Sequence, residues 1–217
     1  DLVYWFSEEV KQANHCNRIA KAYSIMNYLH GKHKVLNRED IKFKDKEFIT
    51  KKLILNTAKT ICNFHSTYLV GNPISLTGSE KLVSRIQNTY NYGGFNNADS
   101  KIADKLVKYG NAYEYIYKDG ERITSKIINN ECAYPVYSET GEYIAFIEYW
   151  TNLDHISYYY VYTDKDVTVW SNEGTELHII DEYRNRTGLP IIYKTNNDYD
   201  YREGVGLLQD IIPVLDE

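Results

Sequence analysis

The stretch KKLILNTAKTICNFHSTYLVGNPISL, residues 51–76, predicts one long helix that runs into an abrupt stop. Small polar residues fill the gaps between apolar residues that recur at spacings of three and four, namely Leu53, Ile54, Ala58, Ile61, Cys62, Tyr68 and Leu69. This pattern is typical of a helix that packs on more than one side. We therefore expect a largely buried scaffold helix, with Ile61 in the packed set and with Asn56 and Asn63 hydrogen-bonded inside.

The stop comes from Gly71, Asn72 and Pro73. A glycine readily takes the left-handed conformation that closes a helix, and we expect Gly71 to do so. Pro73 has no backbone N–H to donate, and it pushes Asn72 out of helical geometry. Taken alone, the stretch predicts no more than the core helix of a globular domain.

The composition is that of a soluble globular chain with one unusual feature. Its 217 residues are 43% hydrophobic and 25% charged, enough for one large domain or two small ones. Tyrosine occurs 22 times, and a tyrosine excess suits half-buried strands and protein interfaces better than a dry core. The net charge of -5 argues against a broad basic face that clamps nucleic acid, but it leaves room for a surface past which nucleic acid slides.

Cysteine and hydropathy patterns narrow the setting of the chain. Cys16, Cys62 and Cys132 are odd in number and far apart, which predicts free thiols in a reducing interior. No apolar run approaches the roughly 20 residues that span a bilayer, so we expect no membrane partner. The first ten residues, DLVYWFSEEV, also lack the basic and continuous apolar parts of a signal peptide.

Helical patterns dominate the first half of the chain. Besides residues 51–76, we expect helices over residues 8–30, 79–90 and 98–110, the last of which closes at Gly110. Residues 32–48, KHKVLNREDIKFKDKEF, carry many charges of both signs and predict an exposed connection, and the sequence NYGGFNN at residues 91–97 predicts a turn.

Strand patterns follow from residue 111. Tyr113, Tyr115 and Tyr117 alternate as on one face of a strand, and further strand-like runs are RITSKII, YIAFIEYWT, SYYYVYTD, DVTVWS and TELHII. Turn-forming stretches separate them at the spacing of an antiparallel meander. Helices first and strands second predict an α+β fold, not alternating βαβ units.

The end of the chain returns to a helical pattern. After Gly188-Leu189-Pro190 we expect a short strand, IIYKTNN, then an acidic loop and an apolar segment over residues 203–217. Pro213 makes that segment either a kinked helix or two short turns. It has no closing signal, which suggests that the next element is missing. We divide the chain into a helical part (1–110), an antiparallel β part (111–196) and a lead-in to a further helix (197–217).

Candidate chemical residues give weak signals. His30 and His33 could begin a metal site, but Gly31 lies between them and no second ligand pair has zinc-like spacing. We interpret the other histidines, His15, His65, His155 and His178, as ordinary polar side chains of helices and strands. The sequence contains no nucleophile elbow, phosphate loop or dinucleotide fingerprint. We assign no catalytic, cofactor-binding or metal-binding residue.

Two alternatives stay open from the residues alone. Carboxylates such as Glu131, Glu148, Asp154, Asp181 and Glu182 could meet in a cleft and serve a hydrolase. Tyr158, Tyr160 and Tyr162 share one strand face and could stack on bases or sugars, so residues 111–196 could form a carbohydrate-binding or adhesion module. A packed sheet or a subunit interface explains the same tyrosines more simply.

Five segments, in order, resemble parts of the portal (connector) proteins of tailed bacteriophages, in the form common among phages of Gram-positive hosts. They are YLHGKHKVL, TAKTICNFHSTYLVGNPIS, KYGNAYEYIYKDGE, NECAYPVYSETG, and GLPIIYKTNND followed by Gly206-Leu207-Leu208. The sequence departs from the usual pattern over residues 199–206. The structural positions that we single out are Ile61, Asn63, Gly71, Asn72, Pro73, Gly110 and Pro190.

The resemblance implies a non-enzymatic structural subunit of a homo-oligomeric ring, typically of twelve copies, at the portal vertex of the capsid. Such a ring is assembled in the bacterial host cytoplasm and passes double-stranded DNA without sequence preference during packaging and ejection. It docks the terminase, scaffold or major capsid proteins and head-completion proteins. The chain would form the first part of the wing, from a phage or a prophage, and stop where the stem begins, and the long helix would be the spine of that wing.

Overall fold

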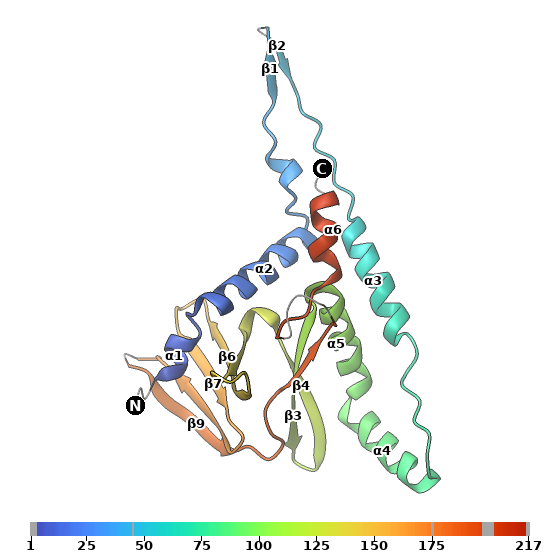
Figure 1. Cartoon of the computed structure of the whole chain (residues 1–217), viewed down its shortest axis with the longest axis vertical. Helices are drawn as coiled ribbons and strands as arrows, with labels where there is room; N and C mark the ends of the chain where they lie inside the picture. Colours follow the sequence, from blue (N-terminus) through green and yellow to red (C-terminus); the bar gives the residue numbers. More distant parts are fainter. Residues whose placement is uncertain (1–3, 45, 175, 197–201, 216–217) are drawn as a thin grey trace.

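The computed structural model describes residues 4–44, 46–174, 176–196 and 202–215 (Figure 1). The α+β class is confirmed, because helices precede a region of antiparallel strands. The helices are α1 (Trp5–Glu9), α2 (Ala13–Leu29), α3 (Thr57–Val70), α4 (Glu80–Gly93), α5 (Phe95–Tyr109) and α6 (Leu207–Leu215), with 3-10 turns η1 (Lys34–Asn37) and η2 (Asn130–Cys132). The strands are β1 (Ile41–Phe43), β2 (Lys46–Phe48), β3 (Asn111–Asp119), β4 (Arg122–Ile128), β5 (Ala133–Tyr137), β6 (Tyr143–Thr151), β7 (Ser157–Tyr162), β8 (Asp166–Ser171), β9 (His178–Arg184) and β10 (Ile191–Lys194).

The strands of the second half form two sheets instead of one meander. Strands β5 to β9 pair in chain order, each antiparallel to the next, so the meander is confirmed for this part of the chain. Strands β3 and β4 belong to a separate antiparallel sheet, which β10 completes by pairing with β3, placing Ile191 opposite Glu114. A buried cluster that includes Tyr113, Phe146 and Tyr162 joins the two sheets.

Two further apolar clusters join the helices to this frame. Phe6 and Val10, from α1 and the residue after it, pack on Ile147 and Val161 of the five-stranded sheet. Ile25, Cys62, Val107 and Leu208 bring α2, α3, α5 and α6 together in a helical core.

Arg18 of α2 is buried and fixes this helix to the strand region. Its guanidinium donates hydrogen bonds to the backbone oxygens of Asn130, at 3.2 Å, and of Ala133. It also lies 5.9 Å from the ring centroids of both Tyr113 and Tyr134. A buried guanidinium needs such partners, so Arg18 couples the helical part to the β part.

The predicted helix over residues 8–30 is two helices. Gln12 takes an extended conformation (ψ 146°), which separates α1 from α2 and turns Phe6 toward the sheet. The expected turn at residues 91–97 is also much shorter, because α4 continues to Gly93 and only Gly94, with φ of 77°, precedes α5. In both places packing against the sheets decides where the helices begin and end, and it overrides the preference of the local sequence.

The break between α1 and α2 buries His15. Its Nε2 atom lies 3.1 Å from Oε1 of Glu9, and burial lowers the pKa of His15 below its ordinary value of 6.5, against the raising effect of the Glu9 hydrogen bond. The imidazole is therefore neutral at pH 7 and donates to the carboxylate. As pH falls below 6.5, the unfolded chain takes up a proton more readily than the folded one, so the stability contributed by His15 is lost.

We therefore expect the His15→Gln variant to lose less stability between pH 7.5 and pH 5.5 than the parent chain does. Glutamine keeps a donor to Glu9 but does not titrate. Urea unfolding at both pH values measures the difference, and His178→Gln, on exposed strand β9, is the matched control. Equal pH dependence of the parent chain and His15→Gln would show that another group controls acid stability.

The helix expected over residues 51–76 is shorter and more exposed than its sequence suggests. Helix α3 covers Thr57–Val70, and only Ala58 and Cys62 are buried. Asn56 and Asn63 are exposed, so the prediction that they bond inside was wrong. Gly71 ends the helix in a right-handed conformation (φ -63°) instead of the left-handed one expected.

The physical reason is that the residues that the structure describes cover α3 on one side and leave much of it exposed. The helix packs on α5 and α6 through its Ala58 and Cys62 side. Phe64, Tyr68 and Leu69, farther along the helix, are left uncovered and are 67%, 84% and 62% exposed. We call these three residues the α3 face.

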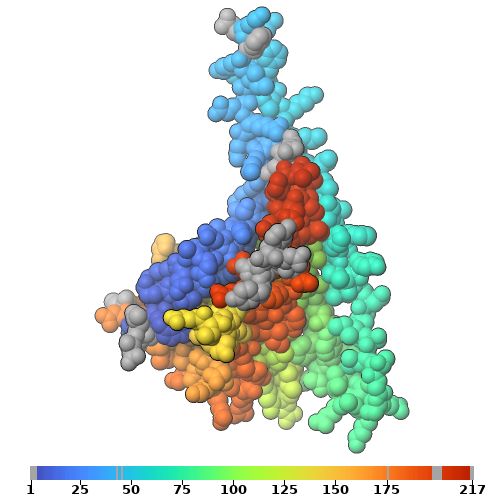
Figure 2. All heavy atoms as spheres, viewed as in Figure 1, coloured from blue at the N-terminus to red at the C-terminus, as the bar shows by residue number. Residues whose placement is uncertain are grey.

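The charged connection that follows α2 is exposed, as expected, and forms an arm. Residues 34–56, the arm, leave the body, turn through the β1–β2 hairpin and return to α3 (Figures 1 and 2). Ile41, Ile49 and Leu53 on this arm are 62%, 84% and 78% exposed. A hairpin of two short strands has little stability of its own.

The segment that leads into α6 runs against the end of α5. Gly110 closes α5 in a left-handed conformation (φ 79°), and its oxygen accepts from the N–H of Thr195 at 2.9 Å. A Cβ on Gly204 would lie 2.0 Å from that same oxygen, so only glycine fits there. Helix α6 then begins at Leu207 and includes Pro213 as one continuous helix.

Candidate functional site

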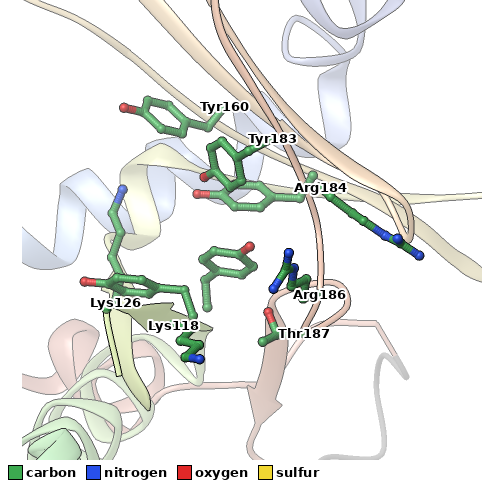
Figure 3. A pocket seen from close by; sticks show the side chains of 11 residues that line it. Lys118, Lys126, Tyr160, Tyr183, Arg184, Arg186 and Thr187 are labelled. Carbon is green, nitrogen blue, oxygen red and sulfur yellow. The ribbon is translucent and has the colours of Figure 1, made fainter. Parts of the chain in front are cut away.

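A cavity of about 540 Å³ lies where the two sheets meet. Figure 3 shows the tyrosine rings, lysines and arginines that line it, which come from several strands. We call it the tyrosine cavity, and its lining residues are Tyr115, Tyr117, Lys118, Gly120, Lys126, Tyr160, Tyr162, Tyr183, Arg184, Arg186 and Thr187. Strands β3 and β4 supply one wall, β7 and β9 the other, and the loop before β10 supplies Arg186 and Thr187.

A continuous row of aromatic rings runs from the five-stranded sheet into this cavity. As expected, Tyr158, Tyr160 and Tyr162 follow one face of β7. Trp150 stacks on both Tyr158 and Tyr160 with centroids 5.5 Å apart. The ring centroids of Tyr162 and of Tyr115, in the other sheet, lie 4.7 Å apart. The Tyr115 ring stacks on the Tyr117 ring with centroids 6.2 Å apart. Because neighbouring rings cover much of each other's faces, the row offers a ligand its edges and hydroxyls more than its faces.

One ion pair joins the two walls. Lys126 of β4 donates to Oε2 of Glu148 of β6 at 2.7 Å, and the Tyr162 hydroxyl donates to the same oxygen at 3.1 Å. The Glu148 side chain is only 8% exposed, whereas that of Lys126 is 41% exposed. The Lys126 ammonium also lies 5.0 Å from the ring centroid of Tyr160. The pair therefore fixes both the separation of the sheets and the tyrosine row.

Asn185 shapes the loop that completes the cavity. This buried side chain donates to the backbone oxygens of Thr163, at 2.6 Å, and Gly188, at 2.9 Å. Its Oδ1 atom accepts from the Tyr115 hydroxyl at 3.2 Å. These bonds hold residues 185–188 in place and so present Arg186 to the cavity.

The cavity is locally basic in an acidic chain. The side chains of Lys118, Arg184 and Arg186 make no hydrogen bond or ion pair with any residue that the structure describes. Figure 3 shows that Arg186 points toward the tyrosine rings, whereas Arg184 points away from them. Burial raises the pKa of Tyr115, Tyr162 and Tyr183, and the Glu148 carboxylate adds to the rise at Tyr162. The tyrosines are therefore neutral hydroxyl groups at pH 7.

The structural positions singled out from the sequence do not lie in this cavity. Ile61 is half-buried on α3, while Asn63, Gly71, Asn72 and Pro73 are exposed on or after that helix. Gly110 closes α5, and the buried Pro190 precedes β10, where its oxygen accepts from the Tyr143 hydroxyl at 2.8 Å. The structure thus places these residues at helix ends and in packing positions, and does not bring them together.

Potential metal ligands are dispersed. His33 is buried against the ring of Tyr28, with centroids 4.0 Å apart, and His15 is paired with Glu9. Within the described ranges no three histidine, cysteine or acidic side chains gather as a metal site would require. Cys16, Cys62 and Cys132 are free. Burial raises the pKa of Cys62 and brings that of the half-buried Cys132 to about 11, so both are protonated thiols at pH 7.

The five candidate carboxylates are also dispersed. Glu148 is the one buried member, and its oxygen is engaged by Lys126 and Tyr162. Asp154, Asp181 and Glu182 are exposed, and none of the five lines the tyrosine cavity. These five carboxylates therefore do not form an acid–base pair that faces the tyrosine cavity.

Known proteins were compared with the chain. A protein-family model described as "Phage portal protein, SPP1 Gp6-like" matches residues 8–217. A search of curated proteins found no match. No helix in the described part of the chain combines the length and apolar character needed to cross a membrane.

Proposed function

Because the chain belongs to the SPP1 Gp6-like family of phage portal proteins, we propose that it forms a subunit of the ring at the portal vertex of a capsid. Members of this family are structural, oligomeric components of the virion. In this ring the chain supplies the wing, with residues 1–110 as its helical part, residues 111–196 as its β part and residues 197–217 as the lead-in to the stem.

The observation that carries the proposal beyond family membership is the exposed apolar surface on one flank. The α3 face and the arm both present large apolar side chains to solvent. Apolar surface of this kind on a soluble protein is typical of a protein interface. Figure 1 shows α3 and α4 along one side of the molecule and β9 on the opposite side.

A closed ring needs two different surfaces on opposite flanks of each subunit, because the contacts run head to tail. The α3 flank and the β9 flank fit this requirement. We assign the α3 face and the arm to the contact with the next subunit. The ring passes double-stranded DNA without sequence preference, which suits an acidic chain that does not hold phosphates. Terminase, scaffold or major capsid proteins and head-completion proteins dock on the assembled ring in the host cytoplasm.

Mass photometry and negative-stain imaging of the full-length product that carries this chain test the proposal. We expect closed rings whose mass is a whole multiple of the subunit mass. Particles that stay monomeric at every protein and salt concentration would overturn the ring assignment.

A further inference from the structure

The tyrosine cavity lies apart from the α3 face and the arm, and it gathers basic side chains in a chain of net charge -5. The side chains of Lys118 and Arg186 make no hydrogen bond or ion pair with a described residue, and Arg186 points toward the rings (Figure 3). An unpaired arginine beside apolar rings is a strong donor to carboxylates, which it can bind with two parallel hydrogen bonds. We propose that the tyrosine cavity binds an acidic segment of a partner protein.

The hydroxyl groups of the cavity point to the same ligand chemistry. Tyr117, Tyr160 and Tyr183 line the cavity and donate no hydrogen bond to a described residue. Their hydroxyl groups are available to carboxylate oxygens in the same cavity that Arg186 lines. Tyrosine and arginine are also the residues that most often dominate protein interfaces.

Two features favour a protein over a nucleic acid. Nucleic-acid strands bind such surfaces by stacking bases on open ring faces, but Trp150 and Tyr162 both stack on Tyr160, and Tyr115 and Tyr117 stack on each other. The basic side chains also occupy one small area and do not form a track along which a phosphate backbone could run. A carboxylate needs only the few donors that are present.

The walls are rigid enough to select such a segment. The Lys126–Glu148 pair holds the two sheets together, and Asn185 fixes the loop that carries Arg186. A cavity of about 540 Å³ is large enough for one or two side chains. A preformed site loses little conformational entropy when it is filled.

The inference rests on the proposed function, because a portal subunit is one that meets other virion proteins. Fluorescence anisotropy with a fluorescein-labelled octapeptide of alternating Asp and Tyr tests it directly. The comparison probes are the same peptide with Asn in place of Asp, and a labelled oligothymidine of matched charge. We expect the acidic peptide to bind more tightly than both.

Arg186→Gln and Lys118→Gln should each weaken binding of the acidic peptide, by about tenfold for Arg186→Gln. Arg85→Gln, which removes an exposed charge on α4 outside the cavity, should leave binding unchanged. Thermal unfolding shows whether each variant is folded. If Arg186→Gln does not fold, peptide binding by Lys118→Gln tests the proposal. The proposal would be overturned if all three variants lost the same amount of affinity for the acidic peptide. It would also be overturned if the Asn peptide bound as tightly as the acidic peptide, or if oligothymidine bound more tightly.

Ring formation by the same variants separates this proposal from the proposed function. Rings that form but do not bind the acidic peptide overturn the cavity assignment alone. Peptide binding by a product that never forms rings supports the cavity and overturns the ring assignment.

Discussion

Replacing both Phe64 and Tyr68 by Asp is expected to stop ring assembly while leaving the subunit folded. The two rings stack on each other, 6.5 Å apart, and are 67% and 84% exposed in the single chain. Since they contact little else, the free energy of unfolding should change by no more than about 0.5 kcal/mol. At a subunit interface, each lost aromatic anchor typically costs about 2 kcal/mol or more, so assembly should require at least about a hundredfold higher concentration.

Mass photometry over a concentration series measures the shift, and circular dichroism with urea unfolding checks the subunit. Leu153→Asp is the matched control, because Leu153 is 98% exposed and lies in the β6–β7 turn, outside the α3 face. It should assemble as the parent does. Rings of the double variant at parental concentrations would show that the α3 face is not part of the contact.

The error about α3 shows what a periodic pattern can and cannot predict. The spacing of Ala58, Cys62 and their neighbours correctly predicts a helix, because apolar residues three and four apart share a face. Tyr68 and Leu69 belong to the same pattern, yet the described residues leave them 84% and 62% exposed. Periodicity indicates that a face is to be buried, but it does not identify the chain that buries it.

The strands were easier to predict than the site that they build. Alternation from Asn111 onward gives the strands, and it gives the shared face of Tyr158, Tyr160 and Tyr162. It does not reveal that β10 returns to β3, or that the strand region divides into two sheets. The cavity depends on both, because its walls come from different sheets and Arg186 lies in the loop before β10.

The most important polar residues gave no signal in the sequence. Asn185 lies in a run of charged residues that reads as a surface loop, yet its side chain is buried and bonded to Thr163 and Gly188. Arg18 resembles any exposed cation on an amphipathic helix, but its guanidinium bonds carbonyls more than 100 residues away. Such roles follow from tertiary contacts, which no local pattern encodes.

Removing the Lys126 charge should destabilise the junction of the two sheets strongly. In Lys126→Met the Glu148 carboxylate, only 8% exposed, keeps the Tyr162 hydroxyl but loses its ammonium partner. Removing one member of a buried pair typically costs 3 to 5 kcal/mol. Because the Lys126 side chain is 41% exposed and water reaches the pair, we expect a loss of about 2 to 3 kcal/mol in urea unfolding.

A second substitution separates charge from packing. Lys126→Met combined with Glu148→Gln removes the unpaired carboxylate but keeps an oxygen that can accept from Tyr162, so it should recover more than half of the loss. Lys11→Met is the matched control, because Lys11 pairs with Glu8 at the same distance of 2.7 Å but both side chains are more than 60% exposed. That variant should lose no more than about 0.5 kcal/mol. If Lys126→Met costs no more than Lys11→Met, the ion pair does not hold the cavity walls together, and the rigidity on which peptide selection depends must come from the Asn185 loop alone.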